Sequence, residues 1–199
     1  MWGRLGGSLL LMWVITADQI GSRRGSDLVP AALDLLDAVP TTLPFTRTVG
    51  DELQGVVPTA ADALRATLVL VRDGRWSVGI GGGEVRLAGE SRASDGPAFV
   101  RARAAVERAK GRRPPVPVAL EDPRSGRLEP LLHLLAAVVG ERSEASWRVV
   151  DLLETGATGV DVAKALDITP QAVSWHRRAS LWDTEVRARH ALAELMDAA

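Results

Sequence analysis

The sequence predicts an α+β protein in two parts: a ferredoxin-like, split βαβ sheet domain, then a small all-α helix-turn-helix domain. Two observations lead to this prediction. Strand-like and helix-like hydrophobic patterns alternate over roughly the first two thirds of the chain, whereas the last part shows only helical patterns. A chain of 199 residues is long enough for one core and a smaller second unit. The expected parts are residues 1–125, a linking helix over 126–142, and residues 143–199.

Composition limits the chemistry that this chain can perform. It has no cysteine, which excludes disulfides, thiolate metal sites and cysteine nucleophiles. Its three histidines lie far apart in the sequence, a pattern that disfavours a histidine zinc cluster. Metal binding would therefore use carboxylates, which favour magnesium or manganese. The net charge of −1 gives no overall attraction to nucleic acid or anionic membranes, so any contact with DNA must be local.

The first element is an apolar run from Leu9 to Ala17, which ends at Asp18. The run is too short for a membrane span, which needs about 20 residues, and no small-x-small cleavage site follows it. We therefore expect a buried strand in a cytoplasmic protein that does not bind membranes. Beyond the strand the chain crosses Gly21 and reaches Arg23 and Arg24.

The next elements follow from helical periodicity and turn residues. Apolar residues at one-faced helical spacing predict helices over residues 26–39 and 59–71. Between them, residues 43–49 and 53–57 read as two strands of a hairpin whose turn contains Gly50 and Asp51.

A further strand over residues 75–80 runs into Gly81–Gly83 and continues beyond it as 84–87. A glycine run in a strand indicates that another part of the backbone approaches closely. Then come a helix over 97–110, a short strand over 116–120, and an apolar helix over 128–139 that contains His133, which we expect to be packed and hydrogen-bonded. This order predicts a split βαβ sheet with its helices on one face.

The first strand and the hairpin would form the centre of this sheet and place Asp18 beside Asp51. Two neighbouring carboxylates repel each other unless a cation lies between them, and magnesium held by carboxylates and substrate phosphates is the usual solution. The alternative is structural: Asp18 caps the following turn, and Asp51 fills a hairpin turn in which aspartate is common. Residue spacing leaves both interpretations open.

The segment after Asp18 would complete a phosphate site. Gly21 and Ser22 could offer backbone N–H groups at a turn that enters a helix, and Arg23 and Arg24 could neutralise phosphate charge.

Four motifs together resemble the catalytic domain of class III nucleotide cyclases: residues 17–22, 47–51, 77–85 and 95–99. The chain resembles the SatD family still more closely. That family has an Asp-x-x-Gly-Ser-Arg start, a Gly-Asp-Glu-x-Gln hairpin and a C-terminal DNA-binding-like region, and the resemblance covers most of residues 9–199. It implies that Asp18 and Asp51 are metal ligands and that Arg47 stands where cyclases carry a base-reading lysine.

The chain departs from the cyclase pattern at two positions. Val100 and Ala104 replace an asparagine and an arginine that stabilise the transition state, and Arg101 and Arg103 project from other faces of the helix. Losing one such donor costs on the order of a hundredfold in rate, although binding survives. We therefore expect a nucleotide-binding sensor that uses Mg or Mn. The alternatives are a metal-dependent nucleotidyl cyclase or nucleoside-triphosphate hydrolase, and a non-catalytic scaffold.

Residues 160–174 fit a helix-turn-helix. Ala163 is small enough for two helices to approach, and Leu166, Ile168 and Val173 fill the joint. Thr169 caps the second helix, with Pro170 at its first position. The segment resembles the DNA-binding helices of sigma-factor and LuxR-type regulators, although Asp167 stands where many of these have glycine.

On that resemblance the second helix would lie in the major groove of DNA. The expected contacts to bases or backbone are Gln171, Ser174, Trp175 and Arg178. The expected phosphate contacts are Arg177, Arg187 and Arg189. Residues 143–199 carry six basic and nine acidic side chains, a net charge of −3. Since DNA-binding units usually present a basic face, a protein-interaction domain is the alternative. The leading hypothesis is a homodimeric transcription regulator that binds DNA and a nucleotide.

Overall fold

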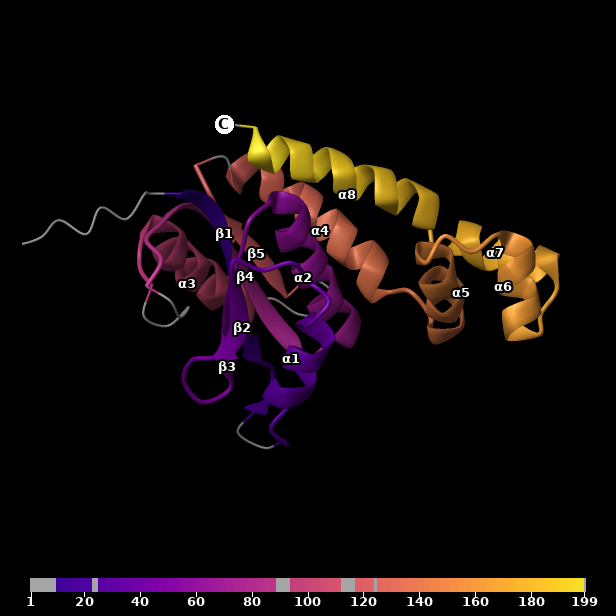
Figure 1. Ribbon diagram of the computed structural model, residues 1–199, viewed down its shortest axis with the longest axis horizontal. Helices are drawn as coiled ribbons and strands as arrows, with labels where there is room; N and C mark the ends of the chain where they lie inside the picture. The colour runs from indigo at the N-terminus through magenta and orange to yellow at the C-terminus, as the bar shows by residue number, and fades with distance from the viewer. Residues whose placement is uncertain (1–9, 23–24, 89–93, 112–116, 124, 199) are drawn as a thin grey trace, which may run out of the picture.

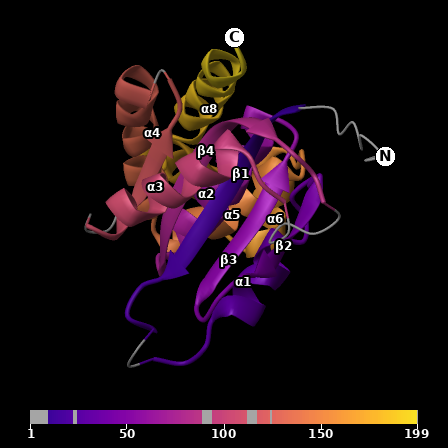
Figure 2. The ribbon, with the colours of Figure 1, turned by 90° about the vertical axis from the view of Figure 1, so that its left-hand side faces the viewer.

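The sheet domain of the computed structural model is built on a five-stranded mixed sheet (Figures 1 and 2). The structure describes residues 10–22, 25–88, 94–111, 117–123 and 125–198. In spatial order the sheet is β2-β3-β1-β4-β5; the β4–β5 pair is parallel and the other neighbours are antiparallel. The strands are β1 (Leu10–Gln19), β2 (Leu43–Arg47), β3 (Glu52–Val57), β4 (Trp76–Val85) and β5 (Val118–Glu121). The protein is thus α+β, and the first four strands have the predicted split βαβ order.

Strand β1 lies at the centre of the sheet, as predicted, because it pairs with β3 on one side and with β4 on the other. Its consecutive residues Val14 and Ile15 are both fully buried, on opposite faces of the sheet. A strand that is covered on both faces reads as a continuous apolar run, which explains the pattern at the start of the sequence.

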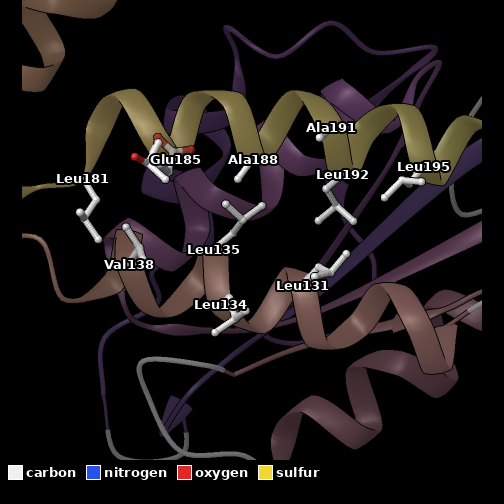
Figure 3. Close-up of a pocket in the computed structure, with 11 residues that line it drawn as sticks. Leu131, Leu134, Leu135, Val138, Leu181, Glu185, Ala188, Ala191, Leu192 and Leu195 are labelled. Carbon is white, nitrogen blue, oxygen red and sulfur yellow. The ribbon is translucent and has the colours of Figure 1, made fainter.

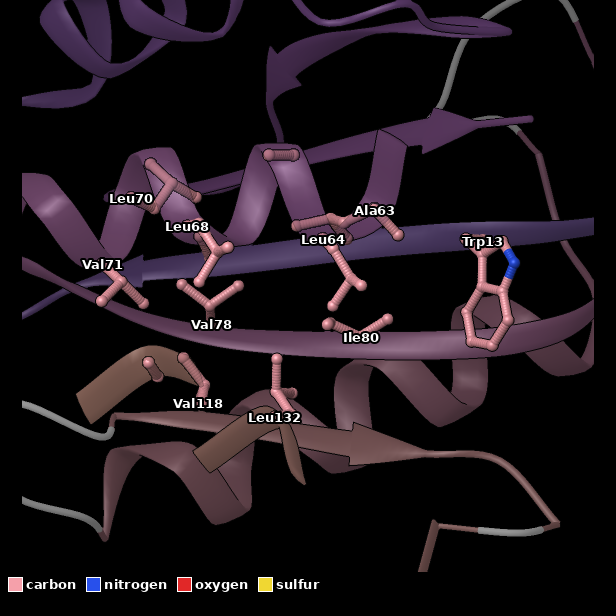
Figure 4. Packing of buried hydrophobic residues seen from close by; sticks show 14 of the residues in the cluster. Trp13, Ala63, Leu64, Leu68, Leu70, Val71, Val78, Ile80, Val118 and Leu132 are labelled. Carbon is pink, nitrogen blue, oxygen red and sulfur yellow. The ribbon is translucent and has the colours of Figure 1, made fainter. Parts of the chain in front are cut away.

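Helices cover both faces of the sheet, so the expectation that they share one face is wrong. The main core lies on the face covered by α1 (Val29–Leu36), α2 (Ala60–Asp73) and α4 (Ser125–Gly140). There the side chains of α2 meet those of β4 (Figure 4). Helix α3 (Pro97–Lys110) packs against the opposite face (Figure 1).

The glycines of β4 allow α3 to approach this closely. A Cβ atom on Gly79 would lie 2.2 Å from the backbone nitrogen of Val106, and one on Gly81 would lie 2.2 Å from the carbonyl oxygen of Ala98. The glycine run therefore marks a close backbone approach, as predicted, and α3 is the element that approaches. Strand β4 continues through the run without a break.

The C-terminal part contains four helices: α5 (Glu144–Glu154), α6 (Gly159–Leu166), α7 (Pro170–Ala179) and α8 (Trp182–Asp197). Helices α5, α6 and α7 share a small core of their own. Helix α8 runs back alongside α4 (Figure 1) and contributes Leu192, Ala193 and Met196 to the core of the sheet domain. Residues 143–199 therefore include a helix that belongs to both parts, while the expected domain boundaries stay a prediction.

The last turn of α8 is anchored to the sheet domain. The carboxylate of Asp197 accepts hydrogen bonds from the Trp13 indole at 3.0 Å and from the backbone N–H of Ala60 at the start of α2. Over the residues that the structure describes, no helix combines the length and the hydrophobicity needed to cross a membrane.

Candidate functional site

The two aspartates predicted as metal ligands lie at the same end of the sheet. Asp18 faces Glu52 across the β1–β3 pair, and the backbone N–H of Gln19 donates to the carbonyl oxygen of Asp51 at 3.3 Å. The hairpin turn therefore sits beside the end of β1, which is the juxtaposition expected from the sequence.

A lysine forms an ion pair with one of these two carboxylates. Lys110, in the last turn of α3, places its ammonium nitrogen 2.9 Å from Asp18 and 2.9 Å from Glu107. Partial burial acts to lower the pKa of Lys110, but hydrogen bonds to Glu107 and Asp18 outweigh it and raise the pKa above the ordinary value. The side chain is therefore charged at neutral pH, and its ammonium group stands where a cation bound by Asp18 would stand.

A second ion pair lies next to the first on the same face of the sheet. The Glu52 side chain is buried, and its carboxylate accepts hydrogen bonds from the Thr48 hydroxyl at 2.5 Å and from Arg103 at 3.0 Å. Arg103 and Lys110 are seven residues apart on α3, so both reach the end of the sheet from one side of that helix.

Arg47, expected to contact the base, is engaged within the protein. Its guanidinium forms an ion pair with Asp27 and donates to the carbonyl oxygen of Gly50 at 2.6 Å. The hydrogen bond from Arg47 is the main reason that the pKa of Asp27 lies below its usual value. Arg47 therefore fastens the hairpin to the loop before α1.

The turn after β1 differs from the expected phosphate turn. Gly21 has a φ of +74°, a conformation that favours glycine, but α1 begins only at Val29. The turn at Gly21 and Ser22 is therefore separated along the chain from the first residue of α1. The buried Gln19 side chain holds the loop by donating to the Ser26 carbonyl at 2.8 Å and accepting from the Leu28 N–H at 3.0 Å. Arg23 and Arg24 lie outside the described residues.

These residues fit a divalent cation only in competition with Lys110. No group of three or more His, Cys, Asp or Glu side chains that could hold a metal occurs within the described ranges. Magnesium is commonly held by one or two carboxylates together with substrate phosphates, and Asp18 and Asp51 could supply the protein's share. The Asp18 carboxylate would have to exchange Lys110 for the metal.

Sequence reasoning missed Lys110, Arg103 and Glu52. The sequence does contain a pattern that points to two of them: the spacing of Arg103, Glu107 and Lys110 places three charges on one face of α3. At the two cyclase positions, Val100 is 71% exposed and Ala104 is also exposed. Arg101 lies away from the β1 end and donates to the carbonyl oxygen of Gly82 at 2.6 Å.

The second candidate site is built on α6 and α7. A capping box between Thr158 and Asp161 starts α6, and the Thr169 hydroxyl accepts the N–H of Ala172 at 3.1 Å to start α7. Between the helices, Asp167 adopts a left-handed conformation with φ of +52°. Glycine adopts this conformation without strain, so Asp167 provides a glycine-like turn at some cost in free energy.

One side of α7 is open to solvent. Gln171, Ser174, Trp175 and Arg178 are all exposed, whereas Val173 is buried in the small core. Their spacing of three, four and seven residues places them on one face of the helix. Arg178 forms no hydrogen bond or ion pair within the part of the chain that the structure describes. These four residues are hereafter called the α7 face.

The three other arginines expected to contact DNA make hydrogen bonds or ion pairs with other residues of this chain. Arg177 makes two hydrogen bonds to Asp183, at 2.8 and 2.5 Å, and lies over the Trp182 ring. The hydrogen bond from Arg177 is also the main reason that the pKa of Asp183 is lowered. Arg187 donates to the Asp183 carbonyl, and Arg189 pairs with Glu154 and Glu185.

A buried polar joint connects the helix-turn-helix to the sheet domain. The Arg142 and Glu185 side chains are 1% and 2% exposed and lie 3.7 Å apart, and burial lowers the pKa of Arg142. The Trp147 ring of α5 packs against the guanidinium groups of Arg142 and Arg72. Arg72 of α2 also forms two hydrogen bonds to Asp151 of α5.

His133 is packed and hydrogen-bonded as predicted, with its Nε2 atom 3.1 Å from the carbonyl oxygen of Val118.

Comparison of the chain with family models, curated proteins and solved structures gave no match.

Proposed function

We propose that this protein is a cytoplasmic transcription regulator that binds DNA through the α7 face. The observation that supports this proposal most directly is that a capped helix-turn-helix leaves four polar or aromatic side chains exposed on one face of its second helix. The other candidate contacts are paired within the chain. A helix of this kind enters the major groove with one face directed toward the base edges.

The residues of the α7 face have chemistry suited to base reading. Gln171 can make two hydrogen bonds to adenine, and Arg178 can contact guanine or a phosphate. Trp175 is 58% exposed and offers an apolar surface to a thymine methyl group. Because the unit carries net negative charge, few phosphate contacts are available. We therefore expect a shallow salt dependence, with a log-log slope on the order of −2 to −4.

DNA binding is tested by selecting fragments from a genomic pool and measuring the anisotropy of labelled fragments over a salt series. Arg178→Ala should weaken binding by about 1–3 kcal/mol, or roughly 5- to 150-fold. Arg127→Ala, which removes an exposed arginine from α4, serves as the matched control and should leave affinity within twofold. If binding is absent or insensitive to salt, the protein-interaction interpretation replaces this proposal.

We also propose that the sheet domain binds a nucleotide with Mg or Mn and lacks catalysis. The meeting of Asp18 with the Asp51 turn supports this proposal, as does the resemblance to the SatD family and to class III cyclases. The ion would bind the two carboxylates and the nucleotide phosphates, and Lys110 would move from Asp18 toward those phosphates. Val100 and Ala104 offer no polar group for a developing charge, which supports binding without turnover.

Nucleotide binding is tested by a thermal-shift panel with and without each metal. A ligand at about 100 times its dissociation constant adds roughly 2.7 kcal/mol to the free energy of unfolding. Asp18→Asn and Asp51→Asn should abolish the shift, while Asp37→Asn, at an exposed aspartate after α1, should retain it. If no nucleotide shifts the wild-type protein, the sheet domain has no such ligand.

A further inference from the structure

An apolar groove runs between α4 and α8 (Figure 3). Its volume is about 330 Å³. Apart from Thr184 and Glu185, the lining side chains are aliphatic, and they include Leu131, Leu134, Leu181, Ala188, Ala191 and Leu195.

Several of these leucines are exposed to solvent. Leu134 is 67% exposed, Leu181 and Leu195 are each 51% exposed, and Leu131 is 40% exposed. The one acidic lining residue, Glu185, directs its carboxylate away from the groove toward Arg142 and Arg189. Single exposed leucines are ordinary, whereas a continuous apolar patch of this kind marks an interaction surface.

Leu181 gives an independent sign that this surface makes contacts. Its φ is +52°, in the left-handed region, which costs a residue with a Cβ atom roughly 1–2 kcal/mol relative to glycine. The strained residue turns the chain from α7 into α8, and its half-exposed side chain lines the groove. Glycine would make the same turn at lower cost, so the chain carries this leucine at a cost in backbone free energy.

We propose that a second copy of this chain packs on this groove, so that α4 and α8 of both copies form a four-helix bundle. A twofold contact requires ridges and hollows on the same surface, because that surface must complement itself. Here the projecting leucines of α4 lie beside the small residues Ala188 and Ala191 of α8. Each leucine ridge can therefore enter the alanine hollow of the other copy.

The size of the face agrees with a dimer. Both helices have 16 residues, so at ~1.5 Å per residue each is ~24 Å long, and neighbouring helix axes lie ~8–10 Å apart. Two such faces in contact bury on the order of 1,000 Å² in total, near the lower limit for a specific interface. An assembly with a dissociation constant in the micromolar range is the expected result.

The same bundle would place the two α7 faces, which we propose bind DNA, in a symmetric arrangement. Because α8 connects the helix-turn-helix to the groove, a twofold axis through the bundle relates two α7 faces, as two half-sites of DNA require. This consequence rests on the proposed DNA binding, whereas the dimer itself does not.

The oligomeric state is measured by analytical ultracentrifugation of the full chain over a concentration series up to about 100 μM. The wild type should sediment as a dimer at the upper end, and Leu134→Glu should sediment as a monomer. Val100→Glu, at an equally exposed valine on α3, should remain dimeric. Circular dichroism should show that all three proteins are folded, since both replaced side chains are mostly exposed. A monomeric wild type, or an unchanged dimer in Leu134→Glu, would overturn the proposal.

Cross-linking locates the interface directly, because the chain contains no cysteine. Under mild oxidation an equimolar mixture of Leu134→Cys and Ala188→Cys chains should give a covalent dimer, and Val100→Cys should not. The reverse result would place the interface elsewhere and overturn the proposal. Flotation of the wild type with anionic lipid vesicles tests a membrane as the other occupant, and binding that Leu134→Glu abolishes in a monomeric wild type would favour the membrane.

The two proposals can fail separately. Arg178→Ala should lose DNA affinity and remain a dimer, whereas Leu134→Glu should bind a single half-site weakly as a monomer. Leu181→Gly is a variant whose loss of dimerisation could not be explained by unfolding. It should raise the melting temperature at low protein concentration and weaken the dimer at least about fivefold. A Leu181→Gly dimer as tight as the wild type would contradict the role given to this side chain.

Discussion

The end of β1 and the α7 face are both rich in polar residues, but the structure treats them in opposite ways. At the end of β1, Asp18 is paired with Lys110, Glu52 with Arg103, and Arg47 with Asp27. On α7, Gln171, Trp175 and Arg178 project into solvent. One region satisfies its charges within the chain, and the other leaves its side chains available to a partner.

This difference explains why we rank DNA binding ahead of nucleotide binding. A ligand at the end of β1 must break existing ion pairs before it gains new contacts, so its net affinity is reduced by their free energy. A ligand of the α7 face displaces only water. The following changes test the contrast, from the largest expected effect to the smallest.

The largest effect on stability is expected at the buried polar joint between the sheet domain and the helix-turn-helix. Glu185→Gln leaves the buried Arg142 guanidinium without its nearest counter-charge, which should lower the free energy of unfolding by about 3–5 kcal/mol. Urea denaturation followed by tryptophan fluorescence measures the loss. Glu154→Gln, at a more exposed partner of Arg189, should cost less than about 1 kcal/mol. Equal losses in the two variants would show that the buried pair has no special weight.

The next change removes the Lys110 ammonium group that pairs with Asp18. Lys110→Met takes a positive charge from a site within about 4 Å of the proposed metal position, so the affinity for Mn²⁺ should rise at least about tenfold. Isothermal titration measures the affinity, and Lys164→Met on α6 is the matched control. The folded-state pKa of Lys110 is raised, so the competition is fully present at neutral pH and is lost only as pH rises through that value. An unchanged affinity would mean that Lys110 does not compete with the ion.

A smaller effect is expected from releasing an arginine toward DNA. Asp183→Asn removes the carboxylate that holds Arg177, which should tighten DNA binding about three- to tenfold at low salt and steepen the salt slope by about one unit. Glu144→Gln removes the same charge from the same unit without freeing an arginine. If both variants tighten binding equally, the gain comes from net charge and Arg177 does not reach a phosphate.

The smallest effect belongs to the turn of the helix-turn-helix. Asp167→Gly relieves the left-handed conformation and should raise the free energy of unfolding by about 0.5–1 kcal/mol. Asp167→Asn tests the charge alone and should change stability less. Thermal unfolding checks both, and a destabilised glycine variant would show that the aspartate side chain holds the turn in another way.

Local patterns predicted most of the fold. The helical spacing of α2, the cap and proline that start α7, and the glycines of β4 each depend on neighbouring residues in the chain, so the sequence displays them directly. The position of α3 could not be read this way. Its small residues report close packing but not the face on which it packs.

The candidate site at the end of β1 shows the same limit. Sequence motifs placed the hairpin turn that contains Asp51 beside the end of β1, because strand pairing follows from the order of the elements. They gave no indication that Lys110 would return to Asp18, since that contact depends on the length and tilt of α3. Which arginines of the C-terminal part are paired likewise depends on the packing of α7 against α8.

The contact between Asp197 and Trp13 joins residues 184 positions apart in the chain. During synthesis the central strand emerges first, and the carboxylate that holds its tryptophan and caps α2 emerges almost last. The sheet domain therefore cannot complete its own core before the helix-turn-helix has been made. Folding of this protein should be slow for its size, and the helix-turn-helix should be present in every molecule whose sheet domain is fully folded.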